Sequence, residues 1–279
     1  MERSRVRSAL TMDSRPTSPA RLYWDAAANS YERDFITTLI GQELRAAVWR
    51  DLDRAFHPGQ RVLELNCGTG LDAVHLAQRG ISVLGCDISG GMIEKARQHS
   101  CIAELGGPIE FRVLATEEIG MLDEAPFDGA FSNFSGLNCV EELTAVRQNL
   151  ARLLRPGARA VLCMLGRFVP WEVCWFLMHG DASKAMRRLR IKGSCDAAPG
   201  ELKVHYYSRR EIVRSFAPEF RLRKWKGLGI VLPPSYVESW ARRFPKVTNT
   251  MAGADRLLGY VPGFRSMADF VLLEFERIE

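Results

Sequence analysis

The sequence lacks the cysteine patterns that mark zinc-binding and disulfide-rich proteins. Its seven cysteines are an odd number, and no two of them are spaced as C-x-x-C. Pairs with that spacing are common zinc ligands, and small disulfide-linked domains carry even numbers of cysteines. Several of the cysteines fall in expected buried strands, where cysteine behaves as a small apolar residue. We therefore expect no metal site and a reducing, cytoplasmic location.

Long uninterrupted apolar runs are also missing. The most apolar stretch, residues 160–178, is broken by Arg167, Pro170 and Glu172, so it is not suited to span a bilayer. Residues 1–20 carry four arginines but no apolar segment follows them, which is untypical of a secretory signal. We expect residues 1–20 to be a disordered tail and the protein to have no stable membrane insertion.

The excess of charge of one sign is small. The chain holds 38 Lys and Arg against 33 Asp and Glu, which gives a formal net charge of +5. Nucleic-acid-binding proteins usually concentrate basic residues in a stripe, so we expect no nucleic-acid partner. Hydrophobic residues make up 47% of the 279 residues, which suffices for the core of one large α/β domain with additions.

What the sequence does contain is a strand, a glycine turn and a helix over residues 61–80. Gly68 and Gly70 allow a sharp turn and a close approach to a ligand, because neither has a Cβ. The N-terminus of the following helix presents free N–H groups to an anionic or carboxylate-bearing group. A second apolar strand over residues 81–86 precedes Asp87, whose carboxylate is suited to the hydroxyls of a ribose. The unit predicts a ribose-containing cofactor at the ends of parallel strands.

Two ribose-containing cofactors fit this unit. Residues 68–73 match G-x-G-x-x-A, and with Asp87 they satisfy the spacing of a nicotinamide dinucleotide site. Glu64 and Asn66 favour a different cofactor, because a carboxylate near the end of a buried strand needs a partner. S-adenosylmethionine brings an ammonium group to that place, whereas a pyrophosphate would be repelled.

The run V-L-E-L-N-C-G-T-G over residues 62–70 resembles motif I of class I S-adenosylmethionine-dependent methyltransferases of the small-molecule, type 11 kind. These enzymes usually read V-L-E-L-G-C-G-T-G, so Asn66 replaces the first glycine. The resemblance implies a Rossmann-like α/β fold, with a seven-stranded sheet that ends in a late antiparallel strand pair. It also implies that Asp87 holds the ribose hydroxyls and that Glu64 supports the loop and the amino end of S-adenosyl-L-methionine.

The same resemblance implies a set of cofactor contacts. The predicted residues are Tyr23, Tyr31, Glu64, Asn66, Gly68, Gly70, Asp87, Ile88, Met92, Thr116, Glu117 and Asn133. The two tyrosines would cover the cofactor from an N-terminal helix, Ile88 and Met92 would line its adenine, and Glu117 would meet the adenine amino group. The alternatives are ordinary core packing for the tyrosines and apolar residues, and a solvated loop position for the carboxylate. Asn133 and Asn138 are interpreted as positioning groups, or as turn residues without chemistry.

The rest of the chain is expected to form a single domain over residues 21–279. An apolar face over residues 35–56 predicts one N-terminal helix, and capping boxes are expected to begin helices at Ser208 and Ser235. Helical insertions at 167–203 and 232–266 would form a lid that carries tryptophans and tyrosine. A basic stretch in the first insertion would hold a phosphate or carboxylate of the substrate, or be a solvated helix face; its residues are Lys184, Arg187, Arg188, Arg190 and Lys192.

The leading functional hypothesis is methyl transfer to a small, largely apolar acceptor, such as a secondary metabolite, a quinone-like compound or a lipid intermediate. The alternatives are an NAD(P)-dependent oxidoreductase and a methyltransferase of RNA or protein. The sequence identifies no catalytic base, although His179 and His205 lie in or beside the first insertion. It also leaves the oligomeric state open.

Overall fold

The computed structural model describes residues 18–124, 126–189, 194–196 and 202–278, and its centre is a seven-stranded sheet of order β3-β2-β1-β4-β5-β9-β8. The strands are β1 (Arg61–Leu65), β2 (Ser82–Asp87), β3 (Ile109–Val113), β4 (Phe127–Ser132), β5 (Leu154–Leu165), β8 (Phe220–Leu228) and β9 (Phe270–Arg277). The first five are parallel, whereas β9 runs antiparallel between β5 and β8. The predicted sheet, with its late antiparallel pair, is confirmed.

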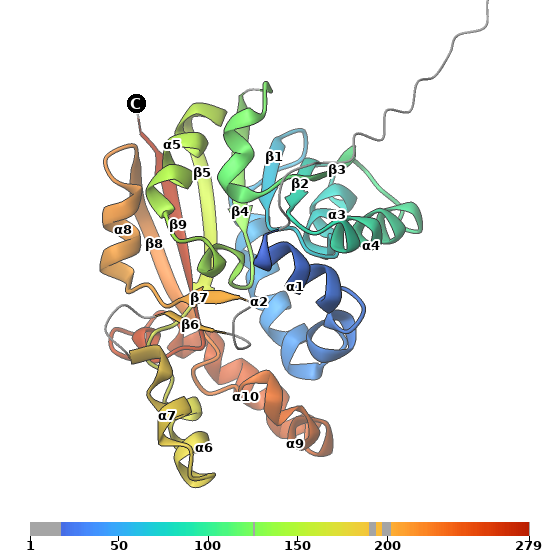
Figure 1. Ribbon diagram of the computed structural model, residues 1–279. Helices are drawn as coiled ribbons and strands as arrows, with labels where there is room; N and C mark the ends of the chain where they lie inside the picture. The colour runs from blue at the N-terminus through green and yellow to red at the C-terminus, as the bar shows by residue number, and fades with distance from the viewer. Residues whose placement is uncertain (1–17, 125, 190–193, 197–201, 279) are drawn as a thin grey trace, which may run out of the picture.

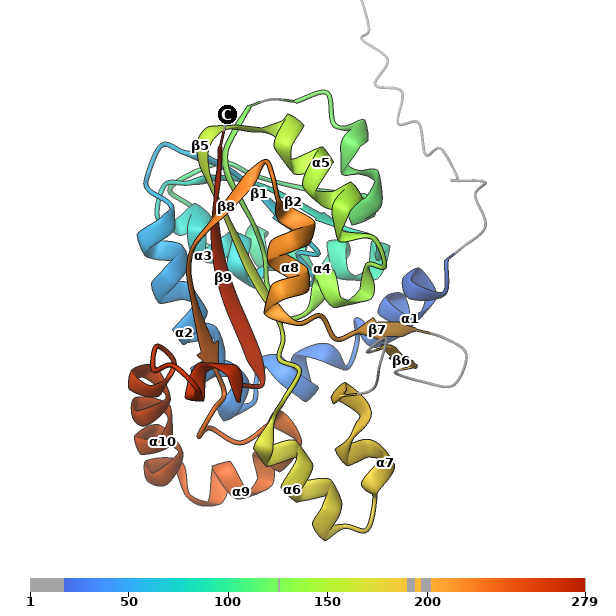
Figure 2. The same ribbon diagram turned by 90° about the vertical axis from the view of Figure 1, so that its left-hand side faces the viewer.

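Helices cover both faces of the sheet, as Figure 1 and Figure 2 show. One face carries α2 (Leu39–Ala55), α3 (Leu71–Gln78) and α4 (Gly90–Cys101), and the other carries α5 (Leu143–Leu153) and α8 (Arg209–Phe216). Alternation along β1 divides its side chains between the faces. Val62 joins the apolar cluster beneath α2 and α3, while Leu63 and Leu65 join the cluster beneath α5 and α8.

The N-terminal region differs from the single helix expected over residues 35–56. A short π-helix, η1 (Glu32–Ile36), is separated from α2 at Thr38. The Thr38 side chain accepts a hydrogen bond from Gly41 N at 2.9 Å and so caps α2. Another helix, α1 (Pro19–Ala27), begins at the end of the expected tail of residues 1–20. Residues 1–17 of that tail lie outside the described residues.

Of the two expected capping boxes, only that at Ser208 is confirmed; it begins α8. At Ser235 the chain forms η5 (Ser235–Val237), and no such box precedes α9 (Glu238–Arg243). The Glu238 carboxylate instead accepts hydrogen bonds from Leu39 N at 2.7 Å and Ile40 N at 3.2 Å. It therefore caps α2, a helix about two hundred positions earlier, because a carboxylate stabilises any helix N-terminus that it reaches.

The elements between β5 and α8, and between β8 and β9, extend beyond one end of the sheet (Figure 1). The first segment contains α6 (Pro170–Met178), α7 (Ala182–Ala185), η4 (Arg187–Leu189) and a small sheet of β6 (Ser194–Asp196) and β7 (Lys203–His205). The second contains η5, α9, α10 (Pro245–Leu258) and η6 (Phe264–Ser266). Within the part of the chain that the structure describes, no helix is both long and apolar enough to cross a bilayer.

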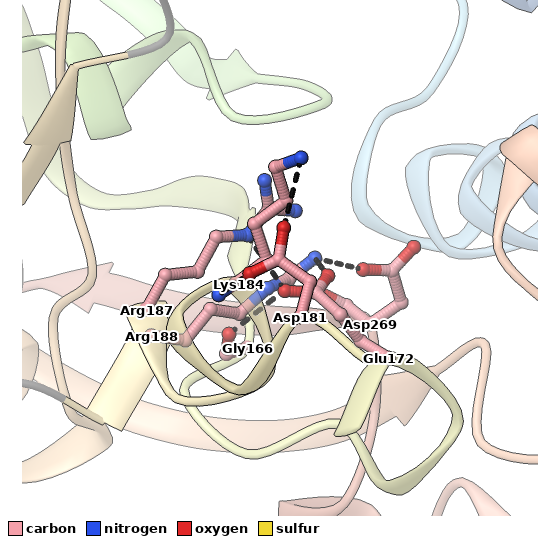
Figure 3. Close-up of polar contacts among 7 residues, drawn as sticks. All are labelled: Gly166, Glu172, Asp181, Lys184, Arg187, Arg188 and Asp269. Atoms are coloured by element: carbon pink, nitrogen blue, oxygen red, sulfur yellow. Dashed lines mark hydrogen bonds and ion pairs between the residues drawn. The ribbon is translucent and has the colours of Figure 1, made fainter. Parts of the chain in front are cut away.

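The described members of the basic stretch, Lys184, Arg187 and Arg188, form ion pairs within the protein, as Figure 3 shows. Arg188 is buried and bonds to Glu172 Oε2 at 2.6 Å, Asp269 Oδ1 at 2.9 Å and the Gly166 carbonyl at 3.1 Å. Arg187 Nε donates to the other oxygen of Glu172 at 2.8 Å. The interpretations as a substrate-phosphate site or a solvated face are therefore wrong for Arg188, which fastens α6 and η4 to the start of β9.

The other three members of that stretch are Lys184, Arg190 and Lys192. Lys184 forms an exposed pair with Asp181 at 3.0 Å, and it is the only described member that matches a solvated face. Arg190 and Lys192 lie outside the described residues.

Replacing Arg188 by alanine would remove the cation that Glu172 and Asp269 share. Breaking a buried ion pair in this way costs about 3–5 kcal/mol, so we expect the free energy of unfolding in urea to fall by that amount. Lys184→Ala is the matched control, because an exposed pair contributes about 0–1 kcal/mol. Equal losses in the two variants would contradict a stabilising role for the buried network.

Candidate functional site

A cavity of about 650 Å³, which includes its opening to solvent, lies at the carboxyl ends of β1, β2 and β4. Its walls come from α1, the turn after β1, the end of β2, the start of α4, and the 3₁₀ helices η2 (Thr116–Met121) and η3 (Gly136–Cys139). Ligands of open α/β sheets bind at this edge. The lining residues are Ala20, Trp24, Tyr31, Asn66, Gly68, Asp87, Ile88, Met92, Thr116, Glu117, Asn133, Phe134, Gly136, Cys139 and Val140.

Asp87 is the buried carboxylate of this cavity. Its two oxygens accept hydrogen bonds from Gly68 N and Ser89 N, each at 2.9 Å. Burial raises the pKa of Asp87 to about 6, against the lowering effect of these backbone donors. Each oxygen retains a lone pair, so the carboxylate can accept hydroxyl donors from a ligand.

Asp25 on α1 closes the same corner. One of its oxygens accepts from Ser89 Oγ at 2.6 Å and from Gly91 N at 3.1 Å, while Ser89 Oγ caps α4 by accepting from Met92 N. Ser89 is thus the N-cap of α4. A carboxylate from α1 thus fixes the N-terminal segment to the start of α4.

The turn after β1 depends on three left-handed residues. Asn66, Gly68 and Gly70 have φ values of 53°, 53° and 74°. A Cβ at Gly68 would meet no atom within 4 Å, so a side chain there would occupy open space at the cavity. A Cβ at Gly70 would lie 2.7 Å from both Ala96 Cβ and Phe111 Cζ. Gly70 therefore allows close packing of the turn against α4 and β3, and it does not line the cavity.

A buried hydrogen-bond network supports the wall formed by Asn133. Asp72, at the start of α3, accepts hydrogen bonds from Arg45 Nη1 at 2.6 Å, Trp49 Nε1 at 2.7 Å and Asn133 Nδ2 at 2.8 Å. The side-chain oxygen of Asn133, Oδ1, accepts a hydrogen bond from Phe134 N at 2.9 Å. Both polar atoms of the amide are thus engaged, which fixes the orientation of Asn133.

Glu64 and Tyr31 border the same network. Glu64 is 1% exposed and does not line the cavity; its Oε2 has no hydrogen-bond partner among the described residues. Burial, and next the charge of Asp72, raise the pKa of Glu64 well above its usual value. Tyr31 does line the cavity, and burial raises its pKa although Arg45 opposes the shift.

Most of the predicted cofactor residues lie together at this cavity, namely Tyr31, Asn66, Gly68, Asp87, Ile88, Met92, Thr116, Glu117 and Asn133. Glu64, Gly70 and Tyr23 are not among its lining residues. The ring of Tyr23 instead packs edge-on against Trp24, with centroids 5.1 Å apart. Their roles in binding the cofactor stay predictions.

Six lining residues were missed from the sequence: Ala20, Trp24, Phe134, Gly136, Cys139 and Val140. A signal existed for two of them, because positions four apart share a helix face. Ala20 and Trp24 have that spacing on α1, whereas Tyr23 is one position from Trp24, about 100° around the helix. The other four lie in or beside the short 3₁₀ helix η3, where the sequence shows no periodicity.

Three other polar residues considered from the sequence, Asn138, His179 and His205, do not converge at the cavity. Asn138 is fully buried and joins two segments, since it donates to the His205 carbonyl at 2.6 Å and accepts from Leu165 N at 2.9 Å. His179 is exposed at the end of α6, where Nδ1 lies 2.8 Å from the Trp175 carbonyl. The ring of His205 stacks near Tyr207. None of these three side chains lines the cavity.

Residues 62–157 match the family model described as "Methyltransferase domain". The matched segment runs from β1 to β5 and contains the turn, Asp87 and Asn133. Together with the sheet order, this match confirms the prediction of a class I S-adenosylmethionine-dependent methyltransferase, a family that uses S-adenosylmethionine as methyl donor. The family match itself covers residues 62–157, about a third of the chain.

Curated relatives match the chain in part. They include O-methyltransferase resE of Aspergillus sclerotiorum (29% identity, 51% of this chain, 52% of the relative) and the tRNA 5-carboxymethoxyuridine methyltransferase of Escherichia coli strain K12 (32%, 48%, 52%). A demethylmenaquinone methyltransferase of Mycobacterium sp. strain KMS is 30% identical over 56% of this chain and 63% of its own. The chain thus spans about half to two thirds of the length of these relatives.

Solved structures share the fold over a larger part of the chain. A methyltransferase from Methanosarcina mazei aligns with a TM-score of 0.56 at 18% identity, covering 82% of this chain and 97% of its own. Magnesium protoporphyrin IX methyltransferase from Synechocystis PCC 6803 aligns with a TM-score of 0.54 at 17% identity, covering 92% and 97%. At such identities the likeness concerns the fold alone.

Replacing Asp72 by alanine would leave the Arg45 guanidinium buried without its counter-ion. We expect the free energy of unfolding in urea to fall by about 3–5 kcal/mol. Asp53→Ala is the matched control, because Asp53 pairs with His75 and Arg79 in a partly exposed position and should contribute about 0–1 kcal/mol. A loss below about 1 kcal/mol for Asp72→Ala would contradict the importance of the network.

Proposed function

We propose that the protein transfers the methyl group of S-adenosylmethionine to a small, largely apolar acceptor. The observation that carries this proposal is the Asp87 carboxylate at the end of β2, which lines the cavity beside Gly68. A carboxylate in this place is suited to accept the two hydroxyls of a ribose. The family match supports the same cofactor.

Other residues suit the remaining parts of S-adenosylmethionine. Ile88 and Met92 offer apolar contacts for the adenine, and Thr116 with Glu117 offers polar atoms to its amino group. The Oε2 of Glu64, which lies in β1 just before the turn, has no hydrogen-bond partner among the described residues and is available to an ammonium group nearby. The residues present therefore fit the cofactor.

An apolar acceptor is supported by the apolar part of the cavity lining. Trp24, Phe134, Cys139 and Val140 belong to that lining, and apolar side chains exclude water from a bound ligand. When bound, S-adenosylmethionine supplies an already activated methyl group, so the chain's residues need to hold and align the acceptor. Such alignment can lower a barrier by about 7–11 kcal/mol. No residue is assigned as general base.

Replacing Asp87 by alanine should raise the Kd for S-adenosylhomocysteine by about 100-fold or more in isothermal titration, because hydrogen bonds to a charged group contribute about 1.5–3 kcal/mol each. His179→Ala should leave this Kd within about twofold, since His179 does not line the cavity. Equal affinities of the two variants would contradict the ribose assignment. Binding of NADH in place of S-adenosylhomocysteine would contradict the choice of cofactor.

The affinity for S-adenosylhomocysteine should also depend on pH through Asp87. Its pKa of about 6 means that the carboxylate is charged above that pH and protonated below it. Since ribose hydroxyls donate to the charged form, we expect the affinity to be constant above about pH 7 and to weaken as the pH falls through 6. Titrations from pH 5 to 8 measure this. If the Asp87→Asn variant shows the same pH profile, the pH dependence of the affinity belongs to another group.

A tRNA base is a second candidate acceptor, because one curated relative at 32% identity is a tRNA methyltransferase. Formation of S-adenosylhomocysteine can be measured with a panel of phenols and quinols and, separately, with unfractionated tRNA. We expect turnover with members of the small-molecule panel and none with tRNA. Turnover with tRNA alone, weakening steeply as salt is added, would overturn the small-molecule proposal.

A further inference from the structure

A second cavity, of about 710 Å³ including its opening to solvent, lies between α2, the end of β8 and α10. These three elements are neighbours at one side of the molecule (Figure 2). The cavity is lined by Glu43, Leu44, Ala47, Arg50, Arg54, Lys226, Gly227, Leu228, Leu232, Ala252, Asp255, Arg256 and Tyr260. It shares no lining residue with the first cavity, and none of its residues has a role in the function proposed above.

Positive charge predominates in its lining. Arg50, Arg54, Lys226 and Arg256 face two carboxylates, of which Asp255 is already satisfied. The Asp255 oxygens accept hydrogen bonds from the backbone N–H groups of residues 229, 230 and 231 at 2.6–2.7 Å. This carboxylate holds the chain after β8 and is not free to pair with the cations.

One buried carboxylate serves several of the cations behind the cavity. Asp51 is 1% exposed, and it pairs with Lys226, with Lys224 at 3.6 Å and with Arg54 at 3.8 Å. Lys226 also donates to the Ala47 carbonyl at 3.3 Å. Because Lys224 also pairs with Glu274 at 2.9 Å, Asp51 is left to balance Lys226 and Arg54, and one positive charge stays in excess at the floor of the cavity.

Arg50 and Arg256 line the cavity from two different helices, α2 and α10. Neither forms an ion pair or hydrogen bond with any of the residues that the structure describes. Guanidinium groups form bidentate bonds with phosphate oxygens and remain charged at every physiological pH. Two unpaired guanidiniums suit a ligand group with more than one negative charge.

The remaining lining is apolar. Leu44, Leu228, Leu232 and Ala252 belong to the buried core, and they reach this cavity from three elements. The ring of the exposed Tyr260 lies 5.8 Å from Lys226 Nζ. A cavity of this kind, with an apolar wall and a few charged groups, is typical of small-molecule sites.

We propose that this second cavity binds a phosphate monoester or diphosphate that carries an apolar chain. The phosphate lies between Arg50 and Arg256, with Lys226 and Arg54 adding positive charge, and the chain lies along the leucines. Such a ligand binds the folded protein and therefore raises its unfolding temperature. Its binding is independent of methyl transfer.

The test uses the full chain with n-octyl phosphate as probe, measured by isothermal titration and thermal unfolding. We expect n-octyl phosphate to bind more tightly than inorganic phosphate, n-octanol or octanoate. Arg50→Gln and Arg256→Gln should each weaken it by about tenfold or more, since each removes a charge-assisted hydrogen bond. Arg210→Gln is the matched control, because Arg210 belongs to α8 on the other face of the sheet. The affinity of this variant for n-octyl phosphate should change by less than about twofold.

Three outcomes would overturn the proposal. Equal weakening in Arg210→Gln would mean general charge attraction, and octanoate binding as tightly as n-octyl phosphate would remove the phosphate assignment. Loss of n-octyl phosphate binding when S-adenosylhomocysteine is saturating would place the probe in the first cavity. Because each measurement is of binding at residues outside the first cavity, failure here leaves the proposed methyl transfer unaffected.

Discussion

The arrangement of the first cavity depends on the buried carboxylate of Asp72. It accepts hydrogen bonds from Arg45 and Trp49 on α2 and from Asn133 after β4, so one side chain joins three segments that are distant in sequence. In a medium of low polarity each of these bonds is strong, and each is costly to leave unmade. The glycine turn precedes Asp72 directly, and the position of the turn is therefore tied to α2 and to the loop that carries Asn133.

Asn66 shows how a departure from a motif is accommodated. The resembling enzymes have glycine at this position, and the backbone here adopts φ of 53°, which asparagine tolerates better than most residues. Its side chain needs room on the opposite loop: a Cβ on Gly136 would lie 2.3 Å from Asn66 Cβ. Asn66 Oδ1 also accepts from Ser132 Oγ at 3.2 Å. The asparagine is thus compatible with the turn because a glycine faces it.

The turn and the strands beside it could be predicted from local patterns, whereas the seven-stranded sheet and most residues of the first cavity were implied by the resemblance to methyltransferase motif I. Apolar runs identify the buried strands. The closely spaced Gly68 and Gly70 identify the turn. The errors concern contacts between distant segments. Glu238 has the spacing of a local capping box, yet it caps α2, and Arg188 has the appearance of a surface cation, yet it is buried against Glu172 and Asp269. Nothing in the spacing of a charged residue reveals which distant partner it meets.

The same physical difference explains why the donor is easier to predict than the acceptor. The ribose and adenine contacts are proposed for residues that follow consecutive strands, so that chain order alone brings them to one edge of the sheet. The lining proposed to meet the acceptor contains Phe134, whose ring packs against Phe35 at 4.9 Å and Phe270 at 5.4 Å between ring centroids. These aromatic residues come from the N-terminal segment, the loop after β4 and the last strand. These three rings meet only in the complete fold, so no local motif in the sequence indicates that they do.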